Sequence, residues 1–330
     1  MSISNISDLS KFTWSQTLFS KADKAIARLN TELTTGRIQD IGRDRINQTS
    51  EITQINQRLS LIDAMEVVQS DADIFFQRVE HALDGIQTKT TYLAEQFLAA
   101  SVTTTPTSHN AVAGVAKDTF DDIITHLNTY AAQQPVFGGA ASTTRPIPDA
   151  EGLWDQLTQV AANATSIQEL DAQLSDWFAA SFDQFVEVDT SHQTQFELSN
   201  GSVVRNSLSA EDATFKDVLK SAALIFLSQE RGFDPADIRQ ALATEAESLW
   251  SAQSQLVDLR AKNGLNQASV ERSKLELDGE KSALTLRYNS LTASDPYETA
   301  SELQATQSQL ERLFVLTARM EKLSFLEYMK

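Results

Sequence analysis

The sequence predicts a mainly α-helical protein built from long antiparallel helical rods, with a terminal coiled coil and a small α+β insert in mid-chain. The first observation is an apolar residue at steps of three and four near both ends of the 330-residue chain. Such spacing is typical of a coiled-coil seam. The N-terminal seam comprises Phe19, Ala22, Ile26, Leu29 and Leu33. The C-terminal seam comprises Leu303, Leu310, Leu313, Phe314, Leu316, Met320, Leu323 and Leu326. The two seams predict that the ends pair with each other or with neighbouring copies.

The second observation is the length of the helical runs inside these ends. Residues 46–86 hold apolar residues at helical spacing without a proline, and a helix of about 41 residues spans ~60 Å. A second run begins at Pro235, a favourable first-turn residue, and extends to about Leu291. Gly264 and Gly279 lie inside it at a cost of about 1 kcal/mol each. Rods of this length need a partner helix along them.

The middle of the chain has a different character. Gly138 and Gly139 follow a short apolar run and predict a turn or hairpin near 135–145. Residues 149–234 are the least periodic, and Asn200-Gly201 predicts a tight turn between two short strands. The aromatic residues of the segment 149–234 share a helical spacing, which favours packing in a core over a sugar-binding platform.

These features divide the chain into three predicted domains. Residues 1–40 and 294–330 form a terminal coiled-coil domain. Residues 41–145 and 235–293 form a helical rod domain that includes the hairpin. Residues 146–234 form an outward-facing acidic insert. Asp295 and Pro296 are expected to cap and begin the final helix.

Charge supports an exposed insert and packed ends. The formal net charge is −18, which argues against nucleic acid or an anionic membrane surface as a partner. Residues 146–234 carry 4 basic and 15 acidic side chains, a net of −11, whereas residues 1–40 carry 5 and 4 and residues 294–330 carry 4 and 6. Nearly neutral ends suit packing against copies, and an acidic middle suits solvent.

No catalytic or cofactor motif stands out. The chain has no cysteine and four dispersed histidines, so thiolate metal sites are excluded and no His pair has metal-ligand spacing. No phosphate-binding glycine loop, calcium loop or serine-nucleophile motif is present. We therefore expect no enzyme, no cofactor and no bound metal. No run is long enough to span a membrane, and residues 1–30 lack the apolar core of a signal peptide.

Four short motifs resemble the bacterial flagellin family, most closely its hook–filament junction members. The stretch Leu29 to Ile38, with Gly36 and Arg37, is similar to the family's N-terminal L-x-x-L-x-S/T-G-K/R pattern. Phe137, Gly138 and Gly139, followed by Pro146, resemble the junction protein's hairpin. The stretch Leu256 to Gly264, with Arg260, resembles the C-terminal L-x-x-L-R-x-x-x-G helix. The chain's last residues resemble the junction protein's closing L-S-L-L-x-Y-L, and Arg43 stands where the family usually has an acid.

The resemblance implies a structural role in the bacterial flagellum rather than catalysis. It implies a hook-associated adaptor that joins the hook to the flagellin filament by helical self-assembly. The implied partners are copies of the chain in a ring, the hook-side junction protein, flagellin and an export chaperone. The implied location is extracellular, after type III export without a cleaved signal peptide. The alternatives are a flagellin, which would polymerise alone, and a coiled-coil interaction protein.

A free-energy comparison predicts that the terminal helices order on assembly. About nine apolar side chains in the last helix contribute on the order of 20 kcal/mol if fully buried. Ordering about 36 residues costs roughly 1–2 kcal/mol per residue in backbone entropy alone. The free energy gained by burying these side chains therefore does not exceed the entropy cost unless a partner is present. Strong hydrogen-exchange protection of residues 303–326 in the dilute monomer would contradict this expectation.

Overall fold

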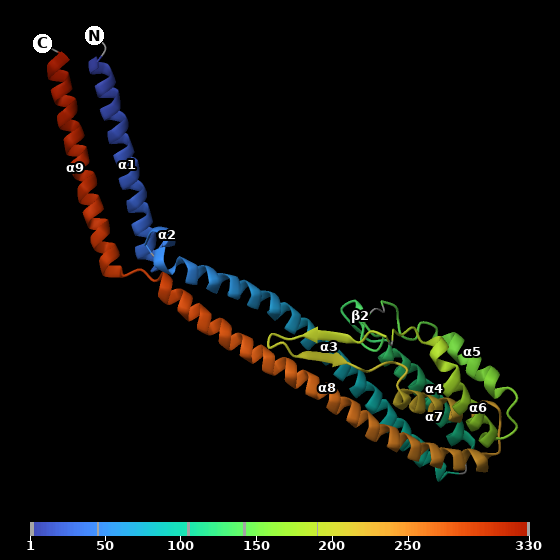
Figure 1. Ribbon diagram of the computed structural model, residues 1–330. Helices are drawn as coiled ribbons and strands as arrows, with labels where there is room; N and C mark the ends of the chain where they lie inside the picture. Colours follow the sequence, from blue (N-terminus) through green and yellow to red (C-terminus); the bar gives the residue numbers. More distant parts are fainter. Residues whose placement is uncertain (1–2, 45, 104–105, 141–142, 190, 329–330) are drawn as a thin grey trace. The chain divides into compact units, whose positions relative to one another are not determined.

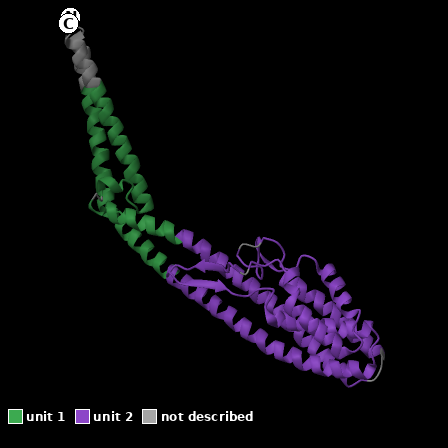
Figure 2. Cartoon of the chain, turned by 45° about the vertical axis from the view of Figure 1, so that its right-hand side comes forward, with its two compact units in different colours: residues 1–62, 278–330 green, residues 63–277 purple. Residues whose placement is uncertain are grey.

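The computed structural model describes residues 3–44, 46–103, 106–140, 143–189 and 191–328. Side chains are described within these ranges from Thr13 to Arg319, apart from Ile46 and Pro106. The chain forms two compact units, residues 1–62 with 278–330 and residues 63–277 (Figure 2). Two long helices, α3 (Thr49–Ser101) and α8 (Pro235–Thr292), contribute to both units. The mainly α fold class predicted from the sequence is confirmed.

The unit of residues 1–62 and 278–330 pairs the two ends of the chain. Helices α1 (Ile3–Thr35) and α9 (Pro296–Tyr328) lie side by side and antiparallel (Figure 1). Two short helices, α2 (Ile41–Asp44) and η1 (Ile46–Gln48), lead from α1 into α3. The start of α3 and the end of α8 pack through Ile52, Ile55 and Leu291.

The unit of residues 63–277 holds the main hydrophobic core. Helices α3 and α8 are joined there by α4 (Pro106–Leu127), α5 (Ala150–Ala161), α6 (Ile167–Ala180), η2 (Phe182–Phe185) and α7 (Ala213–Glu230). Six phenylalanine rings are fully buried in it. They are Phe76, Phe97, Phe120, Phe137, Phe182 and Phe215. One continuous cluster therefore unites the rod helices with the mid-chain segment.

Two antiparallel hairpins complete this unit. Strands β3 (Thr194–Glu197) and β4 (Val203–Asn206) pair around the predicted Asn200-Gly201 turn, where Gly201 has φ +77°. Strands β1 (Tyr130–Ala131) and β2 (Gln134–Pro135) form a smaller pair. The chain turns there at 132–133, ahead of the glycines on which the sequence places the turn.

Helix ends follow the capping residues in the sequence. The Asp295 Oδ1 accepts hydrogen bonds from the Tyr297 and Glu298 amides at 2.8 and 3.2 Å, so the expected cap of α9 is present. The sequence predicts a helix over residues 111–132, after a break that contains Pro106. Helix α4 instead begins at Pro106, because a proline needs no amide partner in a first turn. It ends at Leu127, earlier than predicted, since the Asn128 side chain exchanges two 2.8 Å hydrogen bonds with the backbone of Ile147.

None of the described helices is both long and apolar enough to cross a bilayer.

Candidate assembly surface

The paired terminal helices bring the two predicted apolar seams together. Ala22 and Leu29 of α1 are buried, and Phe19 and Ile26 are half-buried. Across from them, α9 offers three half-buried leucines, Leu303, Leu310 and Leu313. The Phe19 and Phe314 ring centroids lie 4.8 Å apart. Met320, Leu323 and Leu326 lie outside the residues whose side chains are described. The described parts of both seams thus contact each other within one chain.

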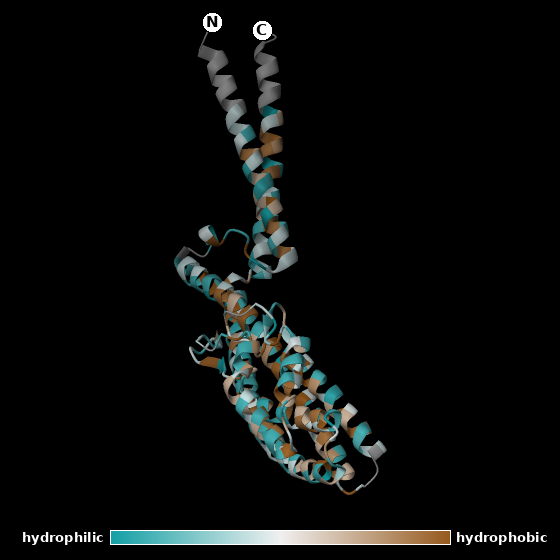
Figure 3. Ribbon diagram, turned by 90° about the vertical axis from the view of Figure 1, so that its right-hand side faces the viewer, coloured by the Kyte–Doolittle hydropathy of each residue, from teal (hydrophilic) through white to brown (hydrophobic). Residues whose placement is uncertain are grey.

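This pairing leaves much of the apolar surface of both helices uncovered. On α1, Leu33 is 42% exposed and Trp14 is 62% exposed. On α9, Phe314, Val315 and Leu316 are each at least half exposed. Figure 3 shows apolar residues along the described parts of both helices. A two-helix pair covers one side of each helix, so the remaining side is available to a third helix, with burial worth roughly 1.5–3 kcal/mol per large side chain.

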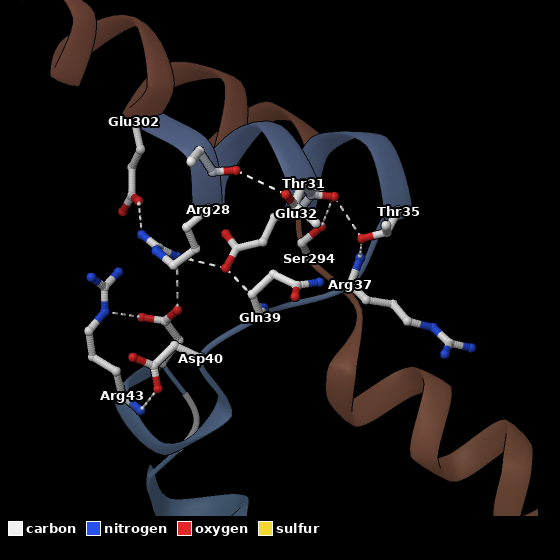
Figure 4. A network of polar contacts seen from close by, with 12 residues as sticks. Arg28, Thr31, Glu32, Thr35, Arg37, Gln39, Asp40, Arg43, Ser294 and Glu302 are labelled. Carbon is white, nitrogen blue, oxygen red and sulfur yellow. Dashed lines mark hydrogen bonds and ion pairs between the residues drawn. The ribbon is translucent and has the colours of Figure 1, made fainter. Parts of the chain in front are cut away.

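A polar network fixes the end of α1 that is nearest the motif loop (Figure 4). Glu32 is only 3% exposed, yet its Oε1 accepts from the Arg28 guanidinium at 2.7 Å and from the Gln39 amide at 3.0 Å. Arg28 also donates to Asp44 at 3.2 Å and lies 3.9 Å from Glu302 of α9. A buried carboxylate is tolerated here because it has a charged donor and a backbone donor. The network therefore ties α1 to α2 and to α9.

The predicted motif loop pairs with the connection between α8 and α9. Gly36 has φ +67°, a conformation that favours glycine, and its carbonyl accepts from the Ser294 amide at 3.0 Å. Arg37 forms an antiparallel bridge with Ala293, and its guanidinium donates to Asn289 at 2.7 Å. The loop thus holds the exit of α1 against the entry of α9.

Arg43, where the sequence departs from the family pattern, makes local contacts. Its Nε donates to Asp44 Oδ1 at 2.8 Å, and its amide donates to Asp40 Oδ1 at 3.1 Å. The hydrogen bond to Asp44 raises the pKa of Arg43.

In the other unit, the Phe137-Gly138-Gly139 motif is an internal packing element. Phe137 is fully buried, with its ring centroid 5.5 Å from that of Phe215. Gly139 has φ +80°, and a Cβ there would lie 2.1 Å from the Asp189 carbonyl oxygen. The segment is held by hydrogen bonds from the Asp189 amide to Gly138 O and from the Ala140 amide to His192 O, at 3.0 and 2.8 Å. Only a glycine fits at position 139, where this segment crosses the loop that contains Asp189.

Arg260 of the second motif links α8 to α3. Its Nε and Nη2 both donate to Glu80 Oε1, at 2.8 and 2.6 Å, and its Nη1 donates to Gln87 at 2.7 Å. The Nη1 also lies 3.0 Å from Asp84. Gly264 has open space where a Cβ would be. The arginine of this motif therefore joins α8 to α3, whereas no neighbouring atom within this chain requires the glycine.

The sequence analysis did not identify Arg28 and Glu32, the two members of the polar network that lie on α1. Arg28 and Glu32 stand four residues apart, which is the spacing of a helical ion pair, and this signal could have found them. Asp44 and Glu302 are remote in sequence, and only the fold places them beside Arg28.

One cluster has the residue types of a serine-nucleophile site but not its geometry. Asp189 accepts hydrogen bonds from Ser191 and His192, which lower its pKa to about 2. The Ser191 hydroxyl and the Asp189 carboxylate both approach the same imidazole nitrogen, Nδ1 of His192, at 3.1 and 2.9 Å. Activation of a serine needs the hydroxyl and the carboxylate on different nitrogens. Among the described residues, no group of His, Asp and Glu has the geometry of a metal site.

Comparison with solved structures gives two informative likenesses. The Bacillus cereus FlgL crystal structure matches with a TM-score of 0.54 and 14% identity, covering 72% of this chain and 99% of that one. The Xanthomonas campestris FlgL structure matches with a TM-score of 0.51 and 11% identity, covering 71% and 99%. No family model matches the sequence, and no curated protein does. The chain therefore has the fold of FlgL, and this likeness spans nearly the whole of those two proteins.

Proposed function

We propose that this chain is a structural component of the bacterial flagellum, an adaptor that joins the hook to the flagellin filament by self-assembly. The observation that carries the proposal is a FlgL fold whose terminal helix pair leaves apolar side chains exposed at Phe314, Val315 and Leu316. Three successive exposed apolar side chains on a chain of net charge −18 are expected at an interaction site.

The domain plan from the sequence fits this role. The terminal helices would form the packed wall of a tube with neighbouring copies, the hook-side junction protein and flagellin. The acidic segment 146–234 would face outward, where its net charge of −11 is best solvated. An export chaperone would cover the apolar side of α9 before secretion by the type III route, which needs no cleaved signal peptide.

A flagellin is the second candidate, favoured by the same terminal pairing. The two differ in what polymerises, because a flagellin extends alone from seeds into long filaments and an adaptor stops at a short ring. A coiled-coil interaction protein is a weaker third candidate, since it does not account for the FlgL fold.

Electron microscopy of cells lacking this chain tests the proposal. Bare hooks with flagellin shed into the medium are the expected result. Bare hooks without shed flagellin would favour the flagellin assignment, and normal filaments would exclude both.

Complementation with surface variants tests the role of α9. Leu316→Asp places a charge at an exposed apolar position of α9 and should leave cells with bare hooks. Leu316→Met keeps an apolar side chain at the same position and should restore filaments. Equal restoration by both variants would remove this surface from the proposal.

A further inference from the structure

Helix α8 carries an exposed apolar stripe in the unit of residues 63–277. Its large members are Trp250, Val257, Leu265 and Leu275, exposed by 40, 49, 70 and 62%. At about 100° per residue these four positions fall within roughly 80° of one another around the helix. Three further exposed residues share that side, namely Ala261, Ala268 and Arg272. The stripe is therefore continuous rather than scattered.

Helix α3 carries a second exposed face of the same kind. Val67 is 61% exposed and Ile74 is 48% exposed, with Asp71 and Arg78 also exposed on that side. These residues stand at i, i+4, i+7 and i+11, which is one side of a helix. A hollow of about 440 Å³ opens beside Ile74, lined by Asp71, Ile74, Phe75 and the turn at 131–134. The part of the α3 face at Asp71 and Ile74 therefore borders a hollow.

The two faces complement each other when the helices run antiparallel. Placing Arg272 opposite Asp71 puts Leu275 beside Val67, and it puts Ala268 beside Ile74. A small residue then meets a large one, and the opposed charges form a pair. Both side chains are exposed. In this register the steps of four and three residues along α3 face steps of three and four along α8, so the pairs on either side of Asp71 and Arg272 are offset by one residue, about 1.5 Å.

One copy of the chain cannot make this contact with itself. Helices α3 and α8 already pack together through their other sides, where Asn263 Nδ2 donates to the Phe76 carbonyl at 3.1 Å. Both Phe76 and Asn263 are buried. At 100° per residue, the exposed face of each helix lies on the side opposite the contact between α3 and α8. The matching surface is therefore on a second copy.

We propose that residues 265–275 of α8 dock on residues 67–78 of α3 of a second copy, with Arg272 paired to Asp71. The contact uses two different surfaces, so it repeats from copy to copy and closes into a ring or winds into a helix. The proposal rests on the proposed function, and it specifies the lateral contact between copies in the rod region, apart from the terminal helices.

The absence of cysteine from the sequence permits a direct test. Val67→Cys and Leu275→Cys chains, carrying different tags, are expressed together in the deletion strain. Isolated hook–filament structures are then treated with a short bismaleimide. A control pairs Leu275→Cys with Leu98→Cys, which alters a 53% exposed residue on another side of α3. We expect mixed dimers about a hundredfold above the control pair, since adjacent thiols have millimolar effective concentrations.

Each outcome separates this contact from the proposed function. Restored filaments with the mixed dimer support both. Restored filaments with mixed dimers no more abundant than the control overturn the lateral contact and leave the adaptor role in place. Dimers of Val67→Cys with itself would also overturn it, because they require a symmetric contact. A deletion strain with normal filaments overturns the adaptor role and this contact with it.

Discussion

Gly139→Ala should destabilise the unit of residues 63–277 far more than Gly201→Ala. Both glycines lie in this unit and have nearly the same positive φ, +80° and +77°. They differ in their surroundings. A Cβ at Gly139 would lie 2.1 Å from the Asp189 carbonyl oxygen, whereas a Cβ at Gly201 would meet nothing within 4 Å. The comparison therefore separates backbone strain from steric exclusion.

The expected magnitudes follow from these surroundings. A left-handed conformation costs an alanine about 1–2 kcal/mol, and the stiffer unfolded chain returns about 0.5 kcal/mol. Gly201→Ala should therefore lose roughly 1 kcal/mol. Gly139→Ala must also separate the 137–140 segment from the loop that contains Asp189. That movement breaks the two backbone hydrogen bonds between them, at about 1 kcal/mol each, so a total loss of about 3 kcal/mol is expected.

Urea unfolding followed by tryptophan fluorescence measures the difference. Three of the four tryptophans, Trp154, Trp177 and Trp250, lie in this unit and report its unfolding. The midpoint should fall about three times as far for Gly139→Ala as for Gly201→Ala, with unchanged slope. Equal shifts would show that the crossing relaxes freely, and they would refute the close-packing explanation of this motif.

Three further changes have defined outcomes. Burial raises the pKa of Glu245 above its ordinary value of 4.5. Ionisation of Glu245 therefore lowers stability progressively as the pH rises from 4.5 to the pKa of the folded state. Glu245→Gln should flatten the fall in melting temperature over that pH range, and an unchanged pH profile would contradict this origin. Arg260→Lys replaces the three guanidinium nitrogens that donate to Glu80 and Gln87 with one ammonium nitrogen. The free energy of unfolding measured in urea should fall by about 1 kcal/mol, since the group is partly exposed; no loss would mean that the charge alone suffices. Phe137→Ala removes a fully buried ring and should lose about 3–5 kcal/mol in the same experiment, whereas a loss under 1 kcal/mol would mean that the core collapses around it.

The sequence predicted the helical elements well because their signals are local. The cap at Asp295, the helix start at Pro235 and the turn at Asn200-Gly201 depend on neighbours within four residues, and all three are present. The ends of α4 were less predictable. Its C-terminus depends on the Asn128 side chain meeting Ile147, a contact that no periodicity records.

The candidate assembly surface could be predicted only in part. The seams were visible because apolar spacing reveals which residues share a side of a helix. Spacing does not reveal which of them a partner covers. Leu29 and Leu33 stand in the same seam, yet Leu29 is 2% exposed and Leu33 is 42% exposed. The antiparallel pairing with α9 decides that difference.

The sequence by itself determined the mainly α class, the two apolar ends, the acidic middle and the positions of the motif residues, because composition, period and capping act over short distances. Only the tertiary structure decided what those motif residues do. Gly139 is required by a loop 50 residues further along the chain, and Arg260 is held by Glu80, 180 residues away. The faces of α3 and α8 became distinguishable as inner and outer only when the two helices packed, because burial is a property of the pair rather than of either segment.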